Sequence, residues 1–199
     1  MRKIFAYAFF VFITVLSANA HAVPITFIHQ GIGSGSIVSI SGSTSFSNAE
    51  FTITELADTG NRTSFGLGFF IDDTVASINI SGLGTFDFIT PTRTFVNNEI
   101  ALVGFSRAGV SGADLFNGPT DPAFSSWNML TSIGPIAGLG GNIDGWTAGA
   151  PPVYTNAGVL IMNTAEPSAT FQAVVPEPAT MLLLGLGIVG IAGLSRLKK

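Results

Sequence analysis

The long middle region of this chain alternates apolar and polar residues with a period of two and contains almost no helix signals. Phenylalanine, valine and isoleucine alternate there with serine, threonine and asparagine, for example over residues 51–54 and 76–80. Because successive side chains on a strand point to opposite faces, such alternation buries one face and leaves the other in water. The pattern therefore predicts an all-β fold of antiparallel strands.

The alternating segments are short, and residues typical of turns separate them. Examples of such turns are Asp58-Thr59-Gly60-Asn61 and Ser81-Gly82-Leu83-Gly84. About eight to ten strands in one domain favour an antiparallel β-sandwich or jelly-roll-like fold over a small barrel. The predicted strands are residues 25–32, 36–40, 50–57, 64–71, 75–80, 84–90, 94–97, 100–106, 159–163 and 170–174, and the less regular stretch between them favours a helical turn over 112–116 and a strand over 126–133.

The charges of the middle region, residues 23–174, exclude one class of partner. This region holds three of the 8 basic residues and eleven of the 12 acidic residues, a formal charge of −8. A surface of this sign repels polyanions, so we do not expect nucleic acid as a partner. The chain has no cysteine, which excludes disulfides, thiolate metal ligands and cysteine nucleophiles.

No sequence motif marks a catalytic site or a metal site. The patterns G-x-S-x-G and H-E-x-x-H, a phosphate-binding loop and EF-hand spacing are all missing. Of the two histidines, only His29 lies in the middle region. One imidazole cannot build a multi-histidine metal centre, and we interpret His29 as a strand residue. We therefore predict no enzymatic activity, no catalytic residues and no cofactor, and we interpret Trp127 and Trp146 as core residues.

Two alternatives use the acidic side chains of the middle region. A pair of carboxylates set across a sugar suffices for a polysaccharide hydrolase or lyase, and sequence spacing does not restrict such a pair. Clustered oxygens at Asp72 and Asp73 would suit Ca²⁺, as in a calcium-dependent adhesin. Several of the acids lie in predicted loops, where aspartate is expected for turn formation alone. We therefore favour a structural or carbohydrate-binding role.

Residues 1–22 have the features of a secretory signal peptide. Arg2 and Lys3 precede a short apolar run, and small residues follow it. Overlapping A-x-A frames allow cleavage after Ala20 or after Ala22, and we favour Ala22. The chain is therefore expected to use the Sec machinery and signal peptidase, which leaves residues 23–174 as one domain.

The C-terminal segment 175–199 contains an apolar stretch that is long enough to span a membrane. The prolines of its first residues disfavour a helix before about Ala179, because each proline fixes its own φ and restricts the residue before it. From there to Leu197 an all-round apolar helix would rise about 28 Å, close to the thickness of the hydrocarbon core. Basic residues end the chain and favour the cytoplasmic side, which places the middle region outside. The proline-containing start is Val175, Pro176, Glu177, Pro178 and Ala179, and the basic residues are Arg196, Lys198 and Lys199.

These three features in this order resemble the PEP-CTERM protein-sorting signal of Gram-negative bacteria. The resemblance covers only residues 175–199, with Leu197 interrupting the basic cluster. It implies recognition by an exosortase-type membrane protease, cleavage near Pro-Glu-Pro, and transfer from an inner-membrane intermediate to the cell surface or the extracellular matrix and its polysaccharide. The middle region is similar to the β-rich secreted domains that commonly carry this tail. The resemblance therefore implies a destination and assigns no activity.

Overall fold

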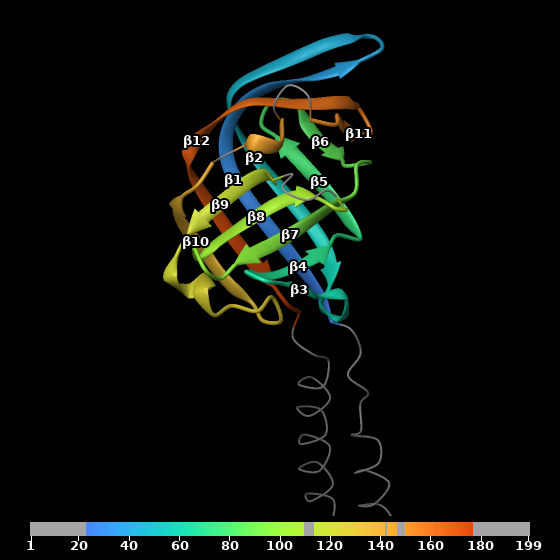
Figure 1. The fold of residues 1–199 in the computed structure, drawn as a ribbon. Helices are drawn as coiled ribbons and strands as arrows, with labels where there is room; N and C mark the ends of the chain where they lie inside the picture. Colours follow the sequence, from blue (N-terminus) through green and yellow to red (C-terminus); the bar gives the residue numbers. More distant parts are fainter. Residues whose placement is uncertain (1–22, 110–113, 142, 147–149, 177–199) are drawn as a thin grey trace, which may run out of the picture.

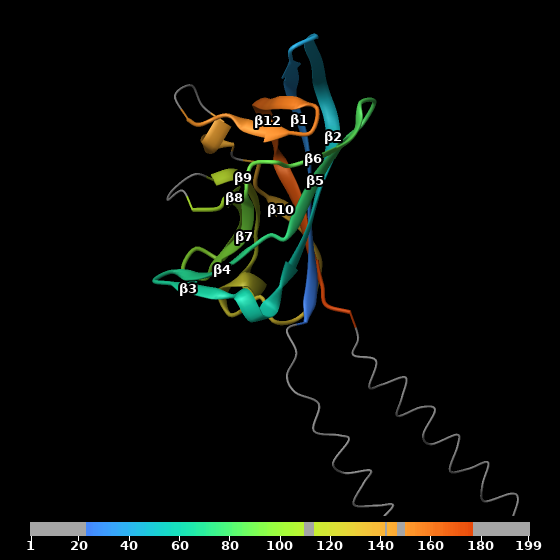
Figure 2. The same ribbon diagram turned by 90° about the vertical axis from the view of Figure 1, so that its right-hand side faces the viewer.

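A computed structural model describes residues 23–109, 114–141, 143–146 and 150–176 of the chain. Twelve strands in these residues form two antiparallel sheets that pack face to face (Figure 1, Figure 2). The predicted all-β antiparallel architecture is confirmed. The strands are β1 (Pro24–Ser39), β2 (Gly42–Asp58), β3 (Thr63–Phe65), β4 (Gly68–Asp72), β5 (Val75–Ile80), β6 (Gly84–Asp87), β7 (Thr92–Asn97), β8 (Leu102–Arg107), β9 (Asp114–Thr120), β10 (Ile133–Leu139), β11 (Val153–Thr155) and β12 (Gly158–Val174), with short 3-10 helices at Thr59–Asn61, Pro122–Ser125 and Asp144–Trp146.

The larger sheet has seven strands and is built around three long ones. Its order is β10-β12-β1-β2-β5-β6, with β11 paired to the beginning of β12. The smaller sheet has five strands in the order β3-β4-β7-β8-β9. Alternation along each strand sends one set of side chains into the space between the sheets, where β5 buries Ala76, Ile78 and Ile80.

Two of the long strands each combine two strands that the sequence predicts as separate. β1 joins the predicted segments 25–32 and 36–40, and β12 joins 159–163 and 170–174. The glycines between the first two segments suggest a turn, but the pairing shifts register there and continues, between Gly31 and Gly33 and again after Ser34. Shifts of this kind bend a strand without ending it, which is why the separation is wrong.

Three further predictions are also wrong in detail. Residues 64–71 form two strands, β3 and β4, which meet at a turn. Within 112–116, the described residues belong to strand β9 and not to a helical turn. Residues 126–132 form a loop, because the Asn98 side chain donates to the carbonyls of Phe124 (2.5 Å) and Trp127 (3.0 Å), and the Trp127 indole donates to the Thr131 carbonyl (2.9 Å).

Aromatic side chains fill the space between the sheets in two clusters. In one cluster Phe51 meets Phe116 edge-on with ring centroids 5.1 Å apart. In the other, Trp127 packs edge-on against Phe171 at 5.5 Å and is only 5% exposed. Trp146 is half-buried against the first cluster. Both tryptophans therefore contact the core, as the sequence predicts, and aromatic burial stabilises a domain that has no disulfides.

The described domain begins and ends at the same end of the molecule. Thr26 near the start of β1 pairs with Val174 at the end of β12. The hairpin between β1 and β2 projects from the opposite end (Figure 1, Figure 2). Residue 176 therefore lies at the end of the domain opposite this hairpin.

Candidate functional site

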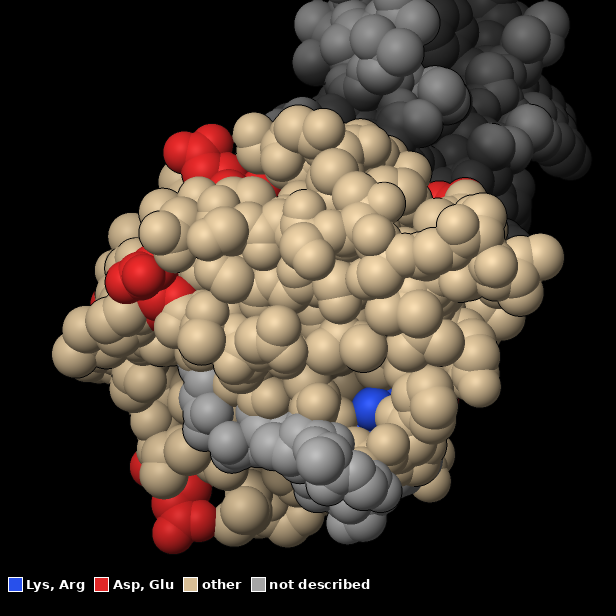
Figure 3. Space-filling model, turned by 90° about the horizontal axis from the view of Figure 1, so that it is seen from above, with Lys and Arg blue, Asp and Glu red and all other residues tan. Residues whose placement is uncertain are grey.

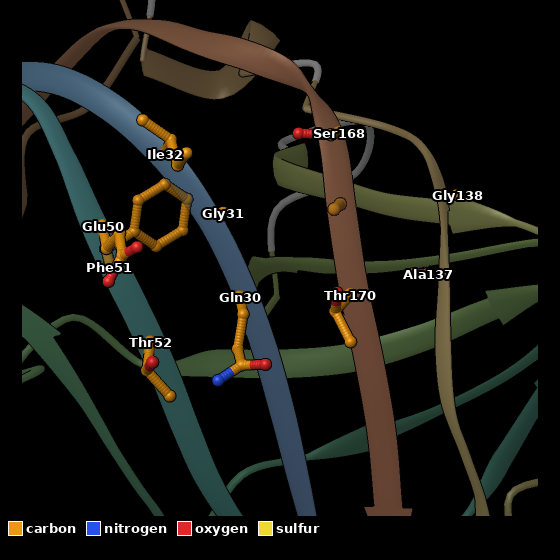
Figure 4. Close-up of a pocket in the computed structure, with 11 residues that line it drawn as sticks. Gln30, Gly31, Ile32, Glu50, Phe51, Thr52, Ala137, Gly138, Ser168 and Thr170 are labelled. Carbon is orange, nitrogen blue, oxygen red and sulfur yellow. The ribbon is translucent and has the colours of Figure 1, made fainter.

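A groove of about 360 Å³ crosses the outer face of the seven-stranded sheet (Figure 4). Four neighbouring strands contribute to it, in the order β2, β1, β12 and β10. Residues 30–32 of β1 run through its centre. The lining residues are Gln30, Gly31, Ile32, Glu50, Phe51, Thr52, Ala137, Gly138, Ser168, Ala169 and Thr170.

Strand register places polar side chains in rows on this outer face. Gln30 pairs with Thr52 on one side and with Thr170 on the other, so these three side chains form one row across the sheet. A second row lies two residues along the strands, where Ile32 pairs with Glu50. Between the rows, Gly31 pairs with Phe51 and Ala169, whose side chains point to the other face. The floor of the groove is consequently made of backbone and small residues.

Gly31 is required at this floor because the core side beneath it is full. A Cβ atom added at Gly31 would lie 2.8 Å from Cζ of Phe51 and 3.0 Å from Cζ of Phe116. Just beyond, Gly33 pairs with Ala165 although Gly31 pairs with Ala169, so β12 contains two more residues than β1 across the shift. This bulge bends the sheet next to the groove.

The groove offers neutral hydrogen-bonding groups and one carboxylate. The Gln30 amide and the hydroxyls of Thr52, Ser168 and Thr170 can donate and accept, and Glu50 is exposed. None of the lining residues is basic. A single carboxylate does not supply the two acids that glycoside hydrolysis needs. The arrangement offers hydrogen bonds to a polar, uncharged ligand.

A second set of polar residues lies inside the domain and is linked across the two sheets. His29 of β1 and Glu55 of β2 are fully buried, with Nε2 of His29 3.5 Å from Oε1 of Glu55. The hydroxyl of Thr94, on the opposite sheet, donates to Oε2 of Glu55. His29 is a strand residue, as the sequence predicts, whereas its contact with Glu55 is not predicted.

Burial disfavours the charged forms of this internal pair. It lowers the pKa of His29 to about 3, and burial together with the negative charge of Asp73 raises the pKa of Glu55 well above its ordinary value. Both shifts favour the neutral form of the side chain concerned. Neither residue lines the groove, and we assign the pair to the core.

The two aspartates of the calcium hypothesis have different surroundings. Asp72 lies on the outer face and pairs with Arg93, with Oδ1 2.9 Å from Nε. The Asp73 carboxylate is buried, and burial raises its pKa to about 8, although the Thr92 side chain and the Thr94 backbone act in the opposite direction. Protonation competes with cation binding. Among the described residues, no group of three or more His, Cys, Asp or Glu side chains is placed to hold a metal ion.

The predicted sorting residues begin directly after the last strand. The Val175 amide donates to Oγ of Ser132 at 2.9 Å, and its side chain packs against the second core cluster. Pro176 is exposed. The remaining predicted routing residues lie outside the described residues, as do the apolar segments at both ends: Ala20, Ala22, Glu177, Pro178, Ala179, Arg196, Lys198 and Lys199. Within the part of the chain that is described, no helix is sufficiently long and apolar to span a bilayer.

The groove residues are not predicted from the sequence. Thr52 and Thr170 are far apart in the chain and become neighbours only through the pairing of β1 with both of their strands. The one available signal is the glycine-rich segment 31–35, since glycine inside a strand pattern indicates a bulge or a close approach.

Comparison with known proteins bears on the C-terminal segment alone. Residues 174–197 match the family model of the PEP-CTERM protein-sorting motif. No curated protein and no solved structure matches the chain significantly. The match begins at the last residue of β12, so the folded domain and the motif adjoin without a linker. Residues 174–197 of this chain therefore carry the PEP-CTERM protein-sorting motif.

Proposed function

We propose that this is an exported protein which an exosortase sorts to the cell surface or the extracellular matrix, where its β-domain binds extracellular polysaccharide. The observation that carries the proposal is the sorting motif directly after a domain with a neutral polar groove. Sugar hydroxyls donate and accept hydrogen bonds, which Gln30, Thr52 and Thr170 complement. The surface seen from above is mostly uncharged, with acidic side chains at its margin (Figure 3).

The groove suggests which polymers to expect. Its one charged side chain is Glu50, and the domain has a formal charge of −8. Long acidic polysaccharides would be repelled, so we propose a neutral polymer as the ligand. The relevant material is the exopolysaccharide of the producing cell, compared with a neutral glucan and with alginate as an acidic reference.

Co-sedimentation of the mature exported protein with these polymers tests the binding role. We expect binding to the native exopolysaccharide that falls at least about tenfold in a Gln30→Ala/Thr170→Ala double variant, which removes hydrogen bonds worth about 0.5–1.5 kcal/mol each. Gln172→Ala is the matched control, because Gln172 lies on the same strand as Thr170 but does not line the groove. Equal binding by the double variant and the control would reject the groove as the site.

The proposed role is non-enzymatic. Glu50 is the one carboxylate of the groove, and the buried Glu55 and Asp73 do not line it. Incubation with the native polymer should therefore release no reducing ends. If reducing ends are released by the unaltered protein and not by Glu50→Gln, the protein hydrolyses the polymer and the non-enzymatic role is rejected.

Mass spectrometry of membrane, surface and medium fractions tests the sorting. We expect the surface form to begin near residue 23 and to lack the segment from the Pro-Glu-Pro motif onwards. An intact C-terminal segment in every fraction would contradict cleavage by an exosortase and would mean that the segment serves as a membrane anchor.

A further inference from the structure

Arg107, the last residue of β8, is a buried cation without an acidic partner among the described ion pairs. Its side chain is 3% exposed, and its Nη2 donates to the Pro151 carbonyl. Its Nε and Nη1 atoms have no hydrogen-bond partner. The ion pairs found within the described residues join His29 to Glu55 and Arg93 to Asp72, and neither includes Arg107.

The other two arginines of the domain are placed differently. Arg93 pairs with Asp72 and lies over the ring of Phe70 at 4.1 Å. Arg62 donates to the Asn128 carbonyl and lies over Phe69 at 4.5 Å. Both are more exposed than Arg107. Only Arg107 combines deep burial with unused N–H groups.

An unpaired buried guanidinium is costly, and Arg107 cannot readily avoid the cost by losing its proton. Burial lowers its pKa, yet arginine remains protonated in proteins at neutral pH. Burial of a charge is tolerated when a partner of opposite charge shares the site. The described ion pairs supply no such partner. A bound anion would therefore compensate the positive charge of this side chain and accept hydrogen bonds from its guanidinium.

Arg107 also lines a cavity that is large enough for a ligand. The cavity has a volume of about 370 Å³ and lies between the end of β8, β11 and the beginning of β12, within the range of small-molecule sites. Trp146, Pro151 and Leu160 supply apolar surface, and Asn163 supplies an amide. Such a lining favours a ring-sized molecule with one apolar face and one charged group.

The charge balance distinguishes between anions. One guanidinium compensates one negative charge, whereas phosphate carries up to two at neutral pH. The surrounding domain is itself acidic, which disfavours any excess negative charge. A carboxylate matches both the single positive charge and the planar donor geometry of a guanidinium.

We propose that Arg107 and the cavity it lines form a binding site for the carboxylate of a small ring-shaped molecule, such as a uronic acid. This site is separate from the outer-sheet groove, and it does not depend on the role proposed for the groove. The carboxylate lies against the guanidinium of Arg107, and the ring lies against the apolar surface that includes Trp146.

Calorimetric titration of the full-length protein tests the proposal with glucuronate and its uncharged methyl ester as probes. We expect glucuronate to bind at least about tenfold more tightly than the ester, because only the acid offers a charge-assisted hydrogen bond. Equal affinities, or no binding of glucuronate, would overturn the proposal. This comparison uses the unaltered chain and so does not depend on how any variant folds.

Two variants and a second anion locate the site. Arg107→Met should abolish the preference for glucuronate, whereas Arg62→Met should keep it, since Arg62 also donates to a backbone carbonyl but lies outside the cavity. Loss of the preference in both variants, or its survival in Arg107→Met, would contradict the assignment. Inorganic phosphate should bind at least about tenfold more weakly than glucuronate, and equal binding would contradict a carboxylate site.

Discussion

The two faces of the seven-stranded sheet carry polar residues with opposite roles. On the inner face, His29 and Glu55 are fully buried and contact each other, and Glu55 is linked to Thr94 of the opposite sheet. On the outer face, Gln30 and Thr52 line an open groove. Neighbouring positions on the same strands thus form either a buried internal link or an open polar surface. The difference lies in whether water reaches them.

The largest expected effect comes from removing the acid of the inner face. Glu55→Ala deletes the partner of His29 and Thr94 and leaves a cavity between the sheets, so we expect the free energy of unfolding to fall by about 2–4 kcal/mol. Urea denaturation measures it. Glu50→Ala removes an exposed acid of the same strand and should change stability by less than about 0.5 kcal/mol. Similar losses in both variants would mean that the two faces do not differ as described.

A second test uses pH, because pH changes the protonation of the buried acids. Burial raises the pKa of Asp73 from 3.8 to about 8, so between these values the folded state keeps a proton that the unfolded chain has lost. Stability should therefore fall as pH rises toward 8. The low pKa of His29, about 3 against an ordinary 6.5, has the opposite effect, but only below 6.5.

The window from pH 6.5 to 8 consequently isolates the acids. There the free energy of unfolding should fall with a contribution from Asp73 of up to about 1.4 kcal/mol per pH unit. Thermal and urea unfolding of Asp73→Asn should show a shallower slope, and Glu50→Gln serves as the control in an exposed acid. A slope unchanged by Asp73→Asn would show that Asp73 is ionised in the folded state.

How much of this comparison the sequence predicts depends on distance along the chain. Phe51, Ile53 and Glu55 occupy alternate positions of β2, so the glutamate lies on the same face as two core residues. The local pattern alone can therefore predict a buried acid. The groove is not, because Thr52 and Thr170 meet only through the register of β1 with two remote strands. Local periodicity determines faces, whereas long-range pairing determines which outer residues become neighbours.

The same distinction explains the strands that were predicted as separate. The glycines in 31–35 and Glu166-Pro167 carry turn signals, yet pairing on both sides of β1 continues past them. Tertiary pairing overrides local preference there. The turn signals mark the bulges that bend the sheet beside the groove.

Gly31 links the two faces and provides a test of intermediate size. In Gly31→Ala the new methyl group would meet the rings of Phe51 and Phe116 at about 3 Å, and overpacking of this kind should cost about 1–2 kcal/mol. Gly66→Ala is the control, since no atom lies within 4 Å of its added Cβ. Urea denaturation compares them. A neutral Gly31→Ala would mean that the core beneath the groove can adjust.

The smallest expected effect on stability belongs to the groove itself, and it completes the comparison. Thr52→Ala removes one hydroxyl from the outer face, so the free energy of unfolding should change by less than about 0.5 kcal/mol. Affinity for the native exopolysaccharide should nevertheless fall about 3-fold to 10-fold, the worth of one hydrogen bond. Thr54→Ala is the matched control, because Thr54 is exposed on the same strand and face but lies outside the groove. A loss of stability in Thr52→Ala as large as that in Glu55→Ala would mean that the outer row of side chains is needed for folding. Weaker binding at unchanged stability would mean that the outer face of the sheet binds the ligand and the inner face stabilises the domain.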